Sequence, residues 1–257
     1  MELMKKNLTY LAGLTTVLLF CSCASHYRLA GVERSRILID NRYDTQLPME
    51  PTAFLVPYKA QVDSIMAPVV GHAARFLAAE APESPLSNLL SDVLMWAGKA
   101  YDEQPDFSVY NIGGMRAAFA QGAVTVGDVL DVAPFENKIC FLTLKGEMVT
   151  ELFRQIAASG GEGVSGTVRL RITKENRLVE ATVNGEPIDP QRTYRVVTLD
   201  YVAQGNDGMA AFKNGTDIHS PKDEHNNVRF IIMDYFREKM AQGQEVDAQK
   251  DGRITVE

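Results

Sequence analysis

The chain has 257 residues, of which 46% are hydrophobic and 23% are charged, and its formal net charge at pH 7 is −7. This composition is ordinary for a globular protein and excludes an intrinsically disordered chain. The acidic balance and the lack of a basic run argue against nucleic acid as a partner, because phosphate backbones are held mainly by lysine and arginine. An anionic small molecule would therefore need a local binding site.

The first 23 residues resemble a bacterial lipoprotein signal peptide. A basic pair, Lys5-Lys6, precedes the apolar residues 8–20, and the cleavage region contains Cys21 and Cys23. We expect Cys23 to be lipidated because a small serine precedes it, whereas a bulky phenylalanine precedes Cys21. An uncleaved anchor is the alternative, but the apolar run is shorter than the roughly 20 residues that span a bilayer. The expected location is the bacterial cell envelope, with a lipid anchor in the membrane and the protein facing the periplasm.

Residues 24–57 are polar with short apolar patches, and we expect them to form a tether with one strand at Arg36–Ile39. Residues 51–81 place apolar side chains at helical spacing, which predicts a helix that Pro68 kinks or breaks. Beyond the signal the chain has one cysteine, Cys140, so no internal disulfide is expected in the mature protein. A buried and inert thiol is the expectation for it.

The segment Glu83–Tyr101 predicts an amphipathic helix. Six apolar residues between Leu86 and Ala97 form one face, and Asp92 lies opposite them. Ser87 is the expected N-cap of this helix. A helix with such a face is expected to pack on a sheet.

The stretch Tyr110–Asn137 begins at the end of a strand and continues through loops. Residues 107–110 alternate between apolar and polar, which predicts a half-buried strand, and glycines 113–114 end it. Thr125 is expected to cap a short helix over Val126–Val132.

The remaining elements follow from the same periodicities, and together they predict an α+β fold with a mixed sheet and packed helices. They are a strand at Ile139–Leu144, a helix at Glu147–Ala158, a flexible glycine-rich loop over residues 160–166, a hairpin of Val168–Ile172 and Leu178–Val183, a turn at Asn184-Gly185, a buried strand at Tyr194–Leu199, a polar loop at Asp200–Gly208, a helix at Val228–Met240 and a final strand at Arg253–Val256. The glycine-rich loop lacks the strand and lysine context of a phosphate-binding loop, so no nucleoside triphosphate site is expected there.

Four side chains of the Tyr110–Asn137 stretch suit an anionic ligand with a flat ring. Arg116 offers a planar fork of donors, Phe135 offers a stacking face, and Asn111 and Asn137 can read the edge of a ring. The same residues are also typical of a strand end followed by a turn with a solvated arginine, and of a loop aromatic that covers a core. Their spacing alone leaves both interpretations open.

Six motifs in a fixed order resemble the C-terminal domain of the 5′-nucleotidase family, over residues 58–257. They are L-S-N-L-L-S-D at 86–92, N-x-G-G-x-R at 111–116, P-F-x-N at 134–137, L-x-G at 144–146, V-S-G at 164–166 and Y-x-V-V-T-x-D-Y-x-A-x-G-x-D-G at 194–208. In that family the domain clamps the nucleoside part of the substrate, so the resemblance implies a nucleoside or nucleoside monophosphate as ligand.

Carried onto this chain, the resemblance implies that Phe135 and Tyr201 sandwich the base and that Asn137 reads its edge. Asp207 would take the ribose hydroxyls, since a carboxylate is a double acceptor that fits a vicinal diol. Arg116 and Asn111 would lie on the phosphate side. Stacking tolerates every base, so the motifs leave the base unnamed.

The chain departs from the family pattern at four positions. Ile112, Ser87 and Asn206 stand where the family usually has glycine, and Asn206 is the mildest because asparagine tolerates a positive φ angle. Pro82 stands where the family commonly has a further phosphate-binding arginine. These departures affect the phosphate half of the implied site more than the base half.

The sequence contains no motif for the two-metal phosphoesterase site that performs hydrolysis in the family. The chain has only four histidines, none in a D-x-H, G-N-H or G-H-x-H motif. His219 and His225, with Asp223 and Glu224, could hold an adventitious metal, but a solvated loop is the simpler explanation. We therefore expect no catalytic residues, resident metal or other cofactor in this chain, and expect divalent metals only on a partner.

Two functions remain open from the sequence. The chain either binds nucleosides or nucleotides and works with a separate metallophosphatase chain, or it is a binding or scaffold lipoprotein that has lost the nucleotide ligand. A hydrolase of unrelated mechanism would need a nucleophile and a base, and Ser84 and Ser165 have no such motif around them.

Overall fold

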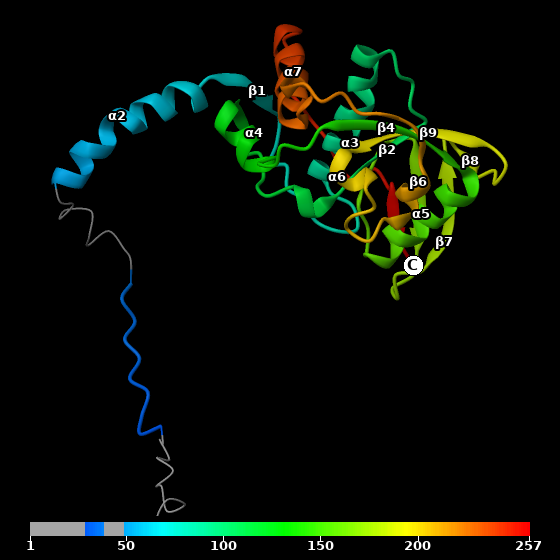
Figure 1. Ribbon diagram of the computed structural model, residues 1–257, viewed down its shortest axis with the longest axis horizontal. Helices are drawn as coiled ribbons and strands as arrows, with labels where there is room; N and C mark the ends of the chain where they lie inside the picture. Colours follow the sequence, from blue (N-terminus) through cyan, green and yellow to red (C-terminus); the bar gives the residue numbers. More distant parts are fainter. Residues whose placement is uncertain (1–28, 39–48) are drawn as a thin grey trace, which may run out of the picture. The chain divides into compact units, whose positions relative to one another are not determined.

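The computed structural model describes residues 29–38 and 49–257 (Figure 1). The chain divides into two units, residues 1–53 and 54–257, and the second unit contains every strand described below. The expected signal peptide and the expected lipidation site Cys23 lie outside the described residues. Residues 36–38 have no regular structure, so the strand expected at Arg36–Ile39 is absent over these three residues. Within the described ranges no helix has both the length and the apolar character needed to cross a bilayer.

The single helix expected over residues 51–81 is instead a helix followed by a strand. Helix α2 spans Met49–Met66, and β1 spans Val69–Ala73 and pairs antiparallel with β3, Gly122–Thr125. The helix ends before Pro68, as a proline predicts. The second half of the prediction was wrong because pairing with a strand that is distant in the sequence overrides the local helical spacing.

Helix α3, Pro85–Ala97, continues as the 3₁₀ turn η2, Gly98–Tyr101. Its N-cap is Ser84, not the expected Ser87. The Ser87 backbone N–H donates to Ser84 Oγ at 3.2 Å, and the Ser84 N–H donates to Ser87 Oγ at 3.0 Å. Pro85 explains the shift, because proline has no N–H to lose and its fixed φ angle suits the first helical position.

Five strands form the central sheet. Across the sheet they are β10 Thr216–His219, β4 Ile139–Lys145, β9 Thr193–Leu199, β2 Phe107–Tyr110 and β5 Gly163–Val164. β2 and β9 are parallel and the other neighbours are antiparallel. The mixed sheet and the helices on it confirm the predicted α+β class.

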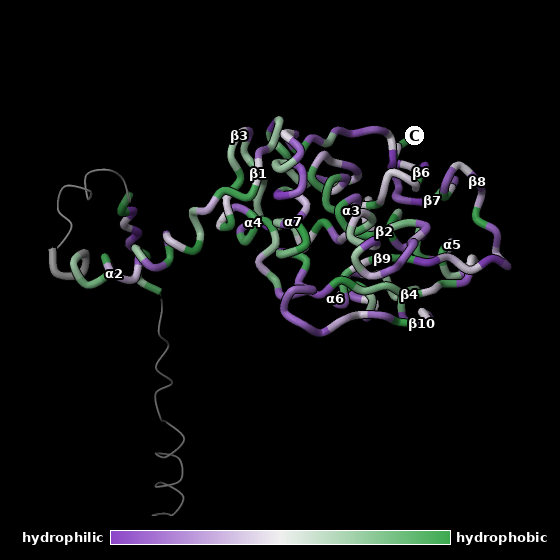
Figure 2. Tube along the Cα trace, turned by 90° about the horizontal axis from the view of Figure 1, so that it is seen from above, coloured by the Kyte–Doolittle hydropathy of each residue, from purple (hydrophilic) through white to green (hydrophobic). Residues whose placement is uncertain are grey.

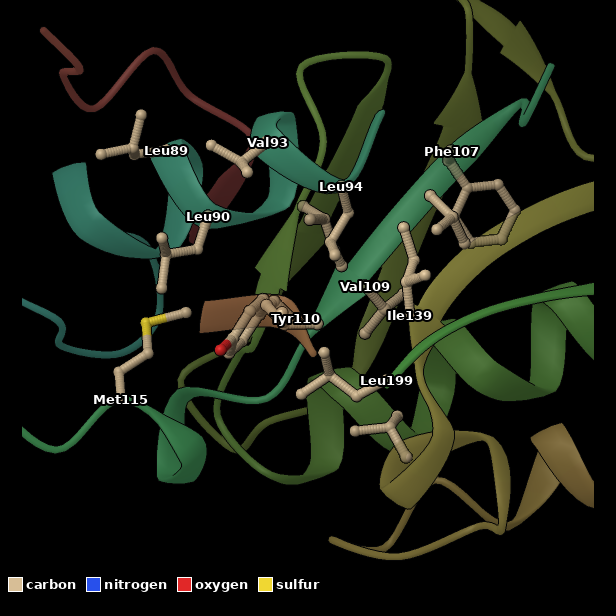
Figure 3. Packing of buried hydrophobic residues seen from close by; sticks show 14 of the residues in the cluster. Leu89, Leu90, Val93, Leu94, Phe107, Val109, Tyr110, Met115, Ile139 and Leu199 are labelled. Carbon is tan, nitrogen blue, oxygen red and sulfur yellow. The ribbon is translucent and has the colours of Figure 1, made fainter. Parts of the chain in front are cut away.

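Both faces of this sheet are covered. On β2, Ser108 Oγ donates to the carbonyl of Ser91 in α3, whereas Phe107 lies on the other face and packs against Phe153 of α5, Gly146–Ala158, with ring centroids 5.3 Å apart. All four residues of β2 are therefore buried, and the half-buried strand expected here was wrong. Figure 3 shows α3 lying over β2, with Leu90 and Met115 near Tyr110.

The remaining elements surround the central sheet. They are α4 Val126–Val132, α6 Asp200–Ala203, α7 Val228–Ala241, the 3₁₀ turns η3 Ile112–Gly114, η4 Ala210–Asn214 and η5 Glu224–Asn226, and a second sheet with β11 Ile254–Val256, β6 Val168–Ile172, β7 Leu178–Val183 and β8 Glu186–Pro187 in that order. The predicted hairpin is confirmed as β6 and β7, and Thr125 caps α4 as expected. In Figure 2 hydrophobic residues run through α4 and β4, while the surface loops are largely hydrophilic.

Candidate ligand-binding pocket

The register of the central sheet brings four loops to one of its ends. β2 and β9 run parallel, so the residues after both strands emerge at the same end. In the antiparallel pairs, Ile139 at the start of β4 lies opposite Leu199 at the end of β9, and Gly163 at the start of β5 lies opposite Tyr110 at the end of β2. The loops before β4 and β5 therefore meet the loops after β2 and β9.

These loops enclose a pocket of about 470 Å³, within the range of small-molecule sites. All six residues that the sequence singled out for ligand binding line it. The lining consists of Asn111, Gly113, Gly114, Arg116, Phe135, Asn137, Glu162, Tyr201 and Asp207. Glu162 was missed by sequence reasoning, because it stands alone among glycines in a loop that matched no binding motif.

Asp207 is held by two side chains of the pocket. The Asn111 side-chain amide donates to Asp207 Oδ2, and the Tyr201 hydroxyl donates to Oδ1 at 3.0 Å. This bond raises the pKa of Tyr201 above its ordinary value. Asp207 itself adopts a φ angle of +53°, so the positive φ expected at Asn206 belongs to its neighbour. The Asn206 side chain instead donates to the Tyr201 carbonyl at 2.7 Å, which ties the loop to α6.

Arg116 and Phe135 form another part of the lining. The Arg116 guanidinium lies 5.9 Å from the centre of the Phe135 ring and donates to the Gly113 carbonyl at 3.1 Å. Phe135 and Tyr201 are 47% and 39% exposed, so each ring keeps accessible surface on which a ligand can stack. Asn137 is joined to α7 through its carbonyl, which accepts from the Val228 N–H at 2.9 Å.

Glu162 is a buried carboxyl group in the wall of the pocket. It is 8% exposed, and its Oε2 accepts a hydrogen bond from the backbone N–H of Ile112. Burial raises the pKa of Glu162 to about 7; the Ile112 N–H opposes this rise and the charge of Asp207 adds to it. The group therefore changes its charge near neutral pH, in a cavity with a second carboxylate.

The glycine-rich segment 160–166 is a fixed wall rather than the flexible loop expected from its composition. Residues 161–165 are buried, and a Cβ atom on Gly161 would lie 2.5 Å from the Pro82 carbonyl oxygen. A Cβ atom on Gly163 would lie 2.8 Å from Ser91 Oγ. The glycines thus serve close backbone packing, and this packing fixes the position of Glu162 between them.

Other candidate reactive groups lie away from the pocket. Across residues 29–38 and 49–257 no group of three or more His, Cys, Asp or Glu side chains is arranged to hold a metal ion. His219 Nδ1 is 3.0 Å from Glu103 Oε1, in an ion-pair cluster with Arg195. Cys140 is buried in β4 as the sequence predicted, and burial raises the pKa of its thiol to about 11, which disfavours the reactive thiolate.

Known proteins resemble this chain over the part that carries the pocket. A family model described as 5′-nucleotidase, C-terminal domain, matches residues 69–214. Protein UshA of Salmonella pullorum is 31% identical over 147 residues, which are 56% of this chain and 25% of that protein. The trifunctional nucleotide phosphoesterase protein YfkN of Bacillus subtilis is 27% identical over 187 residues, or 67% of this chain and 12% of that protein.

Solved structures share the fold. The 5′-nucleotidase precursor from Thermus thermophilus matches 79% of this chain and 42% of its own, with a TM-score of 0.68 and 28% identity. The NAD nucleotidase of Haemophilus influenzae matches 81% of this chain and 41% of its own, with a TM-score of 0.59, and at 18% identity it shows a likeness of fold alone. The chain thus spans a quarter or less of these two curated relatives and about two fifths of these solved chains.

Proposed function

The chain belongs to the 5′-nucleotidase C-terminal domain family, and on that basis we propose that it binds a nucleoside or nucleoside monophosphate in the pocket at the end of the central sheet. In this proposal Phe135 and Tyr201 stack on the base, Asn137 reads its edge and Asp207 accepts from the ribose hydroxyls. Arg116 and Asn111 lie on the phosphate side.

One observation carries the proposal. Six residues from three separate segments of the chain line a single pocket, and their chemistry is that of a nucleoside clamp. Two partly exposed rings supply stacking surfaces, and Asp207 is oriented by Asn111 and Tyr201 so that its carboxylate is held in place. A group fixed before binding loses little entropy when the ligand arrives.

We further propose that hydrolysis, where it occurs, is performed by a separate metallophosphatase chain that works with this one in the cell envelope. The support is in the sequence, which has four histidines and none of the family's metal-binding motifs. Lipid anchoring through Cys23 would keep the protein at a membrane. Assay of the purified chain with AMP and divalent metals tests this part, and sustained metal-dependent hydrolysis would contradict it.

Calorimetric titration of adenosine and AMP into the 257-residue chain tests the clamp. We expect binding of at least adenosine to the wild type, and a loss of about 5- to 150-fold in affinity for Phe135→Ala, because stacking contributes about 1–3 kcal/mol per base. Tyr201→Phe keeps the ring and removes the hydroxyl, so it should lose less affinity than Tyr201→Ala.

Phe76→Ala is a matched control, since Phe76 is 63% exposed and does not line the pocket. It should leave affinity unchanged. Wild-type protein that binds neither ligand would contradict the clamp and favour the alternative, a binding or scaffold protein that has kept the fold without the nucleotide. The departures at Pro82 and Ile112 motivate that alternative.

A further inference from the structure

The charges of the pocket do not favour a phosphate. Its lining carries two carboxyl groups, Glu162 and Asp207, against one guanidinium, Arg116. Arg116 already donates to a backbone carbonyl and lies over the Phe135 ring. When both carboxyl groups are ionised, the net charge of the lining is negative.

Glu162 lies beside Asn111, which the proposed clamp assigns to the phosphate side. Its carboxyl group accepts from the N–H of Ile112, the residue after Asn111, and Asn111 in turn donates to Asp207. Close packing of Gly161 on Pro82 and of Gly163 on Ser91 leaves the backbone around Glu162 little freedom to move away. The carboxyl group therefore stays in the pocket wall in either charge state.

No cation compensates Glu162 in the part of the chain that the structure describes. The neighbouring Pro82 is uncharged, and α3 presents the Ser91 hydroxyl and the backbone carbonyl of Ser87 toward β5. The other titratable groups of the lining are Asp207, Arg116 and Tyr201, and no ion pair found among the described residues includes Glu162. Its charge is therefore available to act on a ligand.

We propose that Glu162 determines specificity by making the pocket select uncharged nucleosides over nucleotides, and that a proton on Glu162 relaxes this selection. The inference rests on the proposed nucleoside clamp and names the ligand class within it. An ionised Glu162 beside Asp207 repels a phosphate group at the same end of the pocket, whereas a nucleoside brings no charge there. A protonated Glu162 removes that repulsion and can donate a hydrogen bond.

The direction of the pH dependence follows from the raised pKa of Glu162, about 7. Below it the carboxyl group is neutral and an anionic ligand is tolerated, and above it the group is ionised and the anion is rejected. AMP is a poor probe of this effect because its own phosphate titrates near pH 6. Adenosine 5′-sulfate carries one charge that does not titrate in this range, so any pH dependence belongs to the protein.

The test measures the affinities of adenosine and adenosine 5′-sulfate for the 257-residue chain at pH 5.5 and pH 8.5. For the wild type we expect the preference for adenosine to grow about tenfold between the two pH values, which corresponds to one charge–charge interaction of moderate strength. Glu162→Gln should show the same preference at both. Glu175→Gln removes the same charge from an exposed turn and should behave as the wild type.

A second measurement needs no variant. Titration of adenosine 5′-sulfate into wild-type protein at pH 7.5, in buffers of different ionisation enthalpy, should show proton uptake on binding, and adenosine should show little. If adenosine binds and the preference is the same at both pH values, without proton uptake, the role of Glu162 is overturned while the clamp stands. If adenosine itself fails to bind, the clamp and this inference fall together.

Discussion

Two buried ionisable groups next to strand β5 differ in how their charges are compensated. Glu162 directly precedes the strand and is 8% exposed, with one hydrogen bond, from Ile112, found among the described residues. Arg253 is 5% exposed, and its guanidinium donates to the carbonyl of Val164 in the same strand at 2.9 Å. Among the described residues Glu162 has no counter-ion, whereas Arg253 pairs with two carboxylates.

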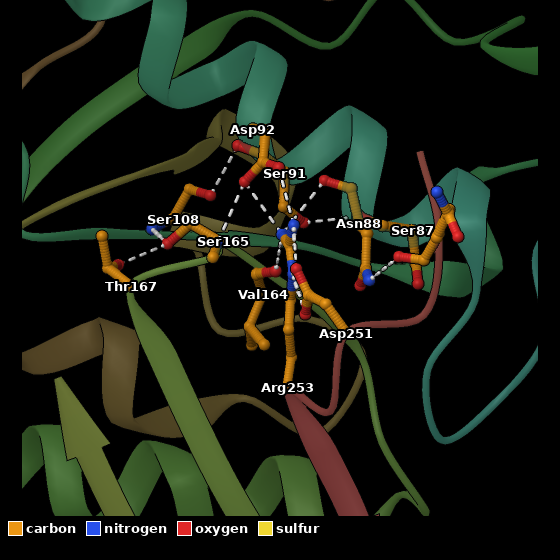
Figure 4. A network of polar contacts seen from close by, with 12 residues as sticks. Ser87, Asn88, Ser91, Asp92, Ser108, Val164, Ser165, Thr167, Asp251 and Arg253 are labelled. Atoms are coloured by element: carbon orange, nitrogen blue, oxygen red, sulfur yellow. Dashed lines mark hydrogen bonds and ion pairs between the residues drawn. The ribbon is translucent and has the colours of Figure 1, made fainter. Parts of the chain in front are cut away.

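Figure 4 shows how Arg253 is partnered. Its guanidinium meets both oxygens of Asp92, at 2.8 and 2.7 Å, and its Nε donates to Asp251 Oδ1 at 3.1 Å. It also donates to the carbonyl of Asn88, so it joins α3, β5 and the start of β11. Arg253, which connects three elements, is thus neutralised by adjacent carboxylates. Glu162, for which no counter-ion is found among the described residues, lies in the pocket wall instead.

The largest loss of stability is expected when the Arg253 guanidinium is removed. Arg253→Leu should lower the free energy of unfolding by about 2–4 kcal/mol, because it removes the guanidinium that donates to two carboxylates and to the carbonyls of Asn88 and Val164. The expected loss is smaller than for a fully buried ion pair, because the Asp92 and Asp251 side chains are 43% and 45% exposed and can be hydrated. Urea denaturation measures it.

Arg253→Lys is the matched variant, because it keeps the charge but loses the planar fork. We expect it to recover part of the lost stability. A change below about 1 kcal/mol for Arg253→Leu would show that the network is dispensable, and the contrast with Glu162 would lose its basis.

A change of intermediate size is expected at Glu162, where the substitution should raise the free energy of unfolding. Its folded-state pKa of about 7 lies above the ordinary value of 4.5, so the folded protein holds the proton more tightly than the unfolded chain. Stability contributed by the neutral form is fully present below pH 4.5 and is lost as pH rises through 7. Glu162→Gln should therefore raise the free energy of unfolding at pH 8.5 by about 1–3 kcal/mol and change it little at pH 4.

Urea denaturation at both pH values checks this prediction, with Glu175→Gln as the control for a lost surface charge. Equal stability of Glu162→Gln and wild type at pH 8.5 would mean that Glu162 finds a compensating partner in solution. The difference between Glu162 and Arg253 would then be one of geometry rather than charge.

Local signals in the sequence predicted much of the fold. Helix α4 and its Thr125 cap, and the β6–β7 hairpin, depend on residues close together in the chain, and both are confirmed. Strand β1 was mistaken for helix because its partner β3 is remote. The burial of β2 was underestimated because its second face is covered by α5, which comes from a distant part of the sequence, whereas α3 lies just before β2 in the chain.

The pocket was predictable in its residues but not in its geometry. Motifs singled out Asn111, Phe135 and Asp207, yet only the pairing of β2, β4 and β9 shows that their loops meet. Glu162 was missed because glycines on both sides indicated a flexible loop. The sequence offered one signal, a lone carboxylate among glycines. Only the structure shows that these glycines pack closely against neighbouring backbone and side chains.

The smallest effect is expected at an ion pair that resembles the Arg253 pair in geometry but not in burial. Arg75 meets Asp247 through Nε and Nη2, the latter at 2.8 Å from Oδ2, and the two side chains are 47% and 39% exposed. Water already solvates both charges, so Arg75→Gln should cause no measurable change in the urea midpoint at physiological salt. If Arg75→Gln destabilised the protein as much as Arg253→Leu, bidentate geometry rather than burial would determine how much an ion pair contributes to stability. The lack of an ion pair for Glu162 among the described residues would then carry no special meaning for stability.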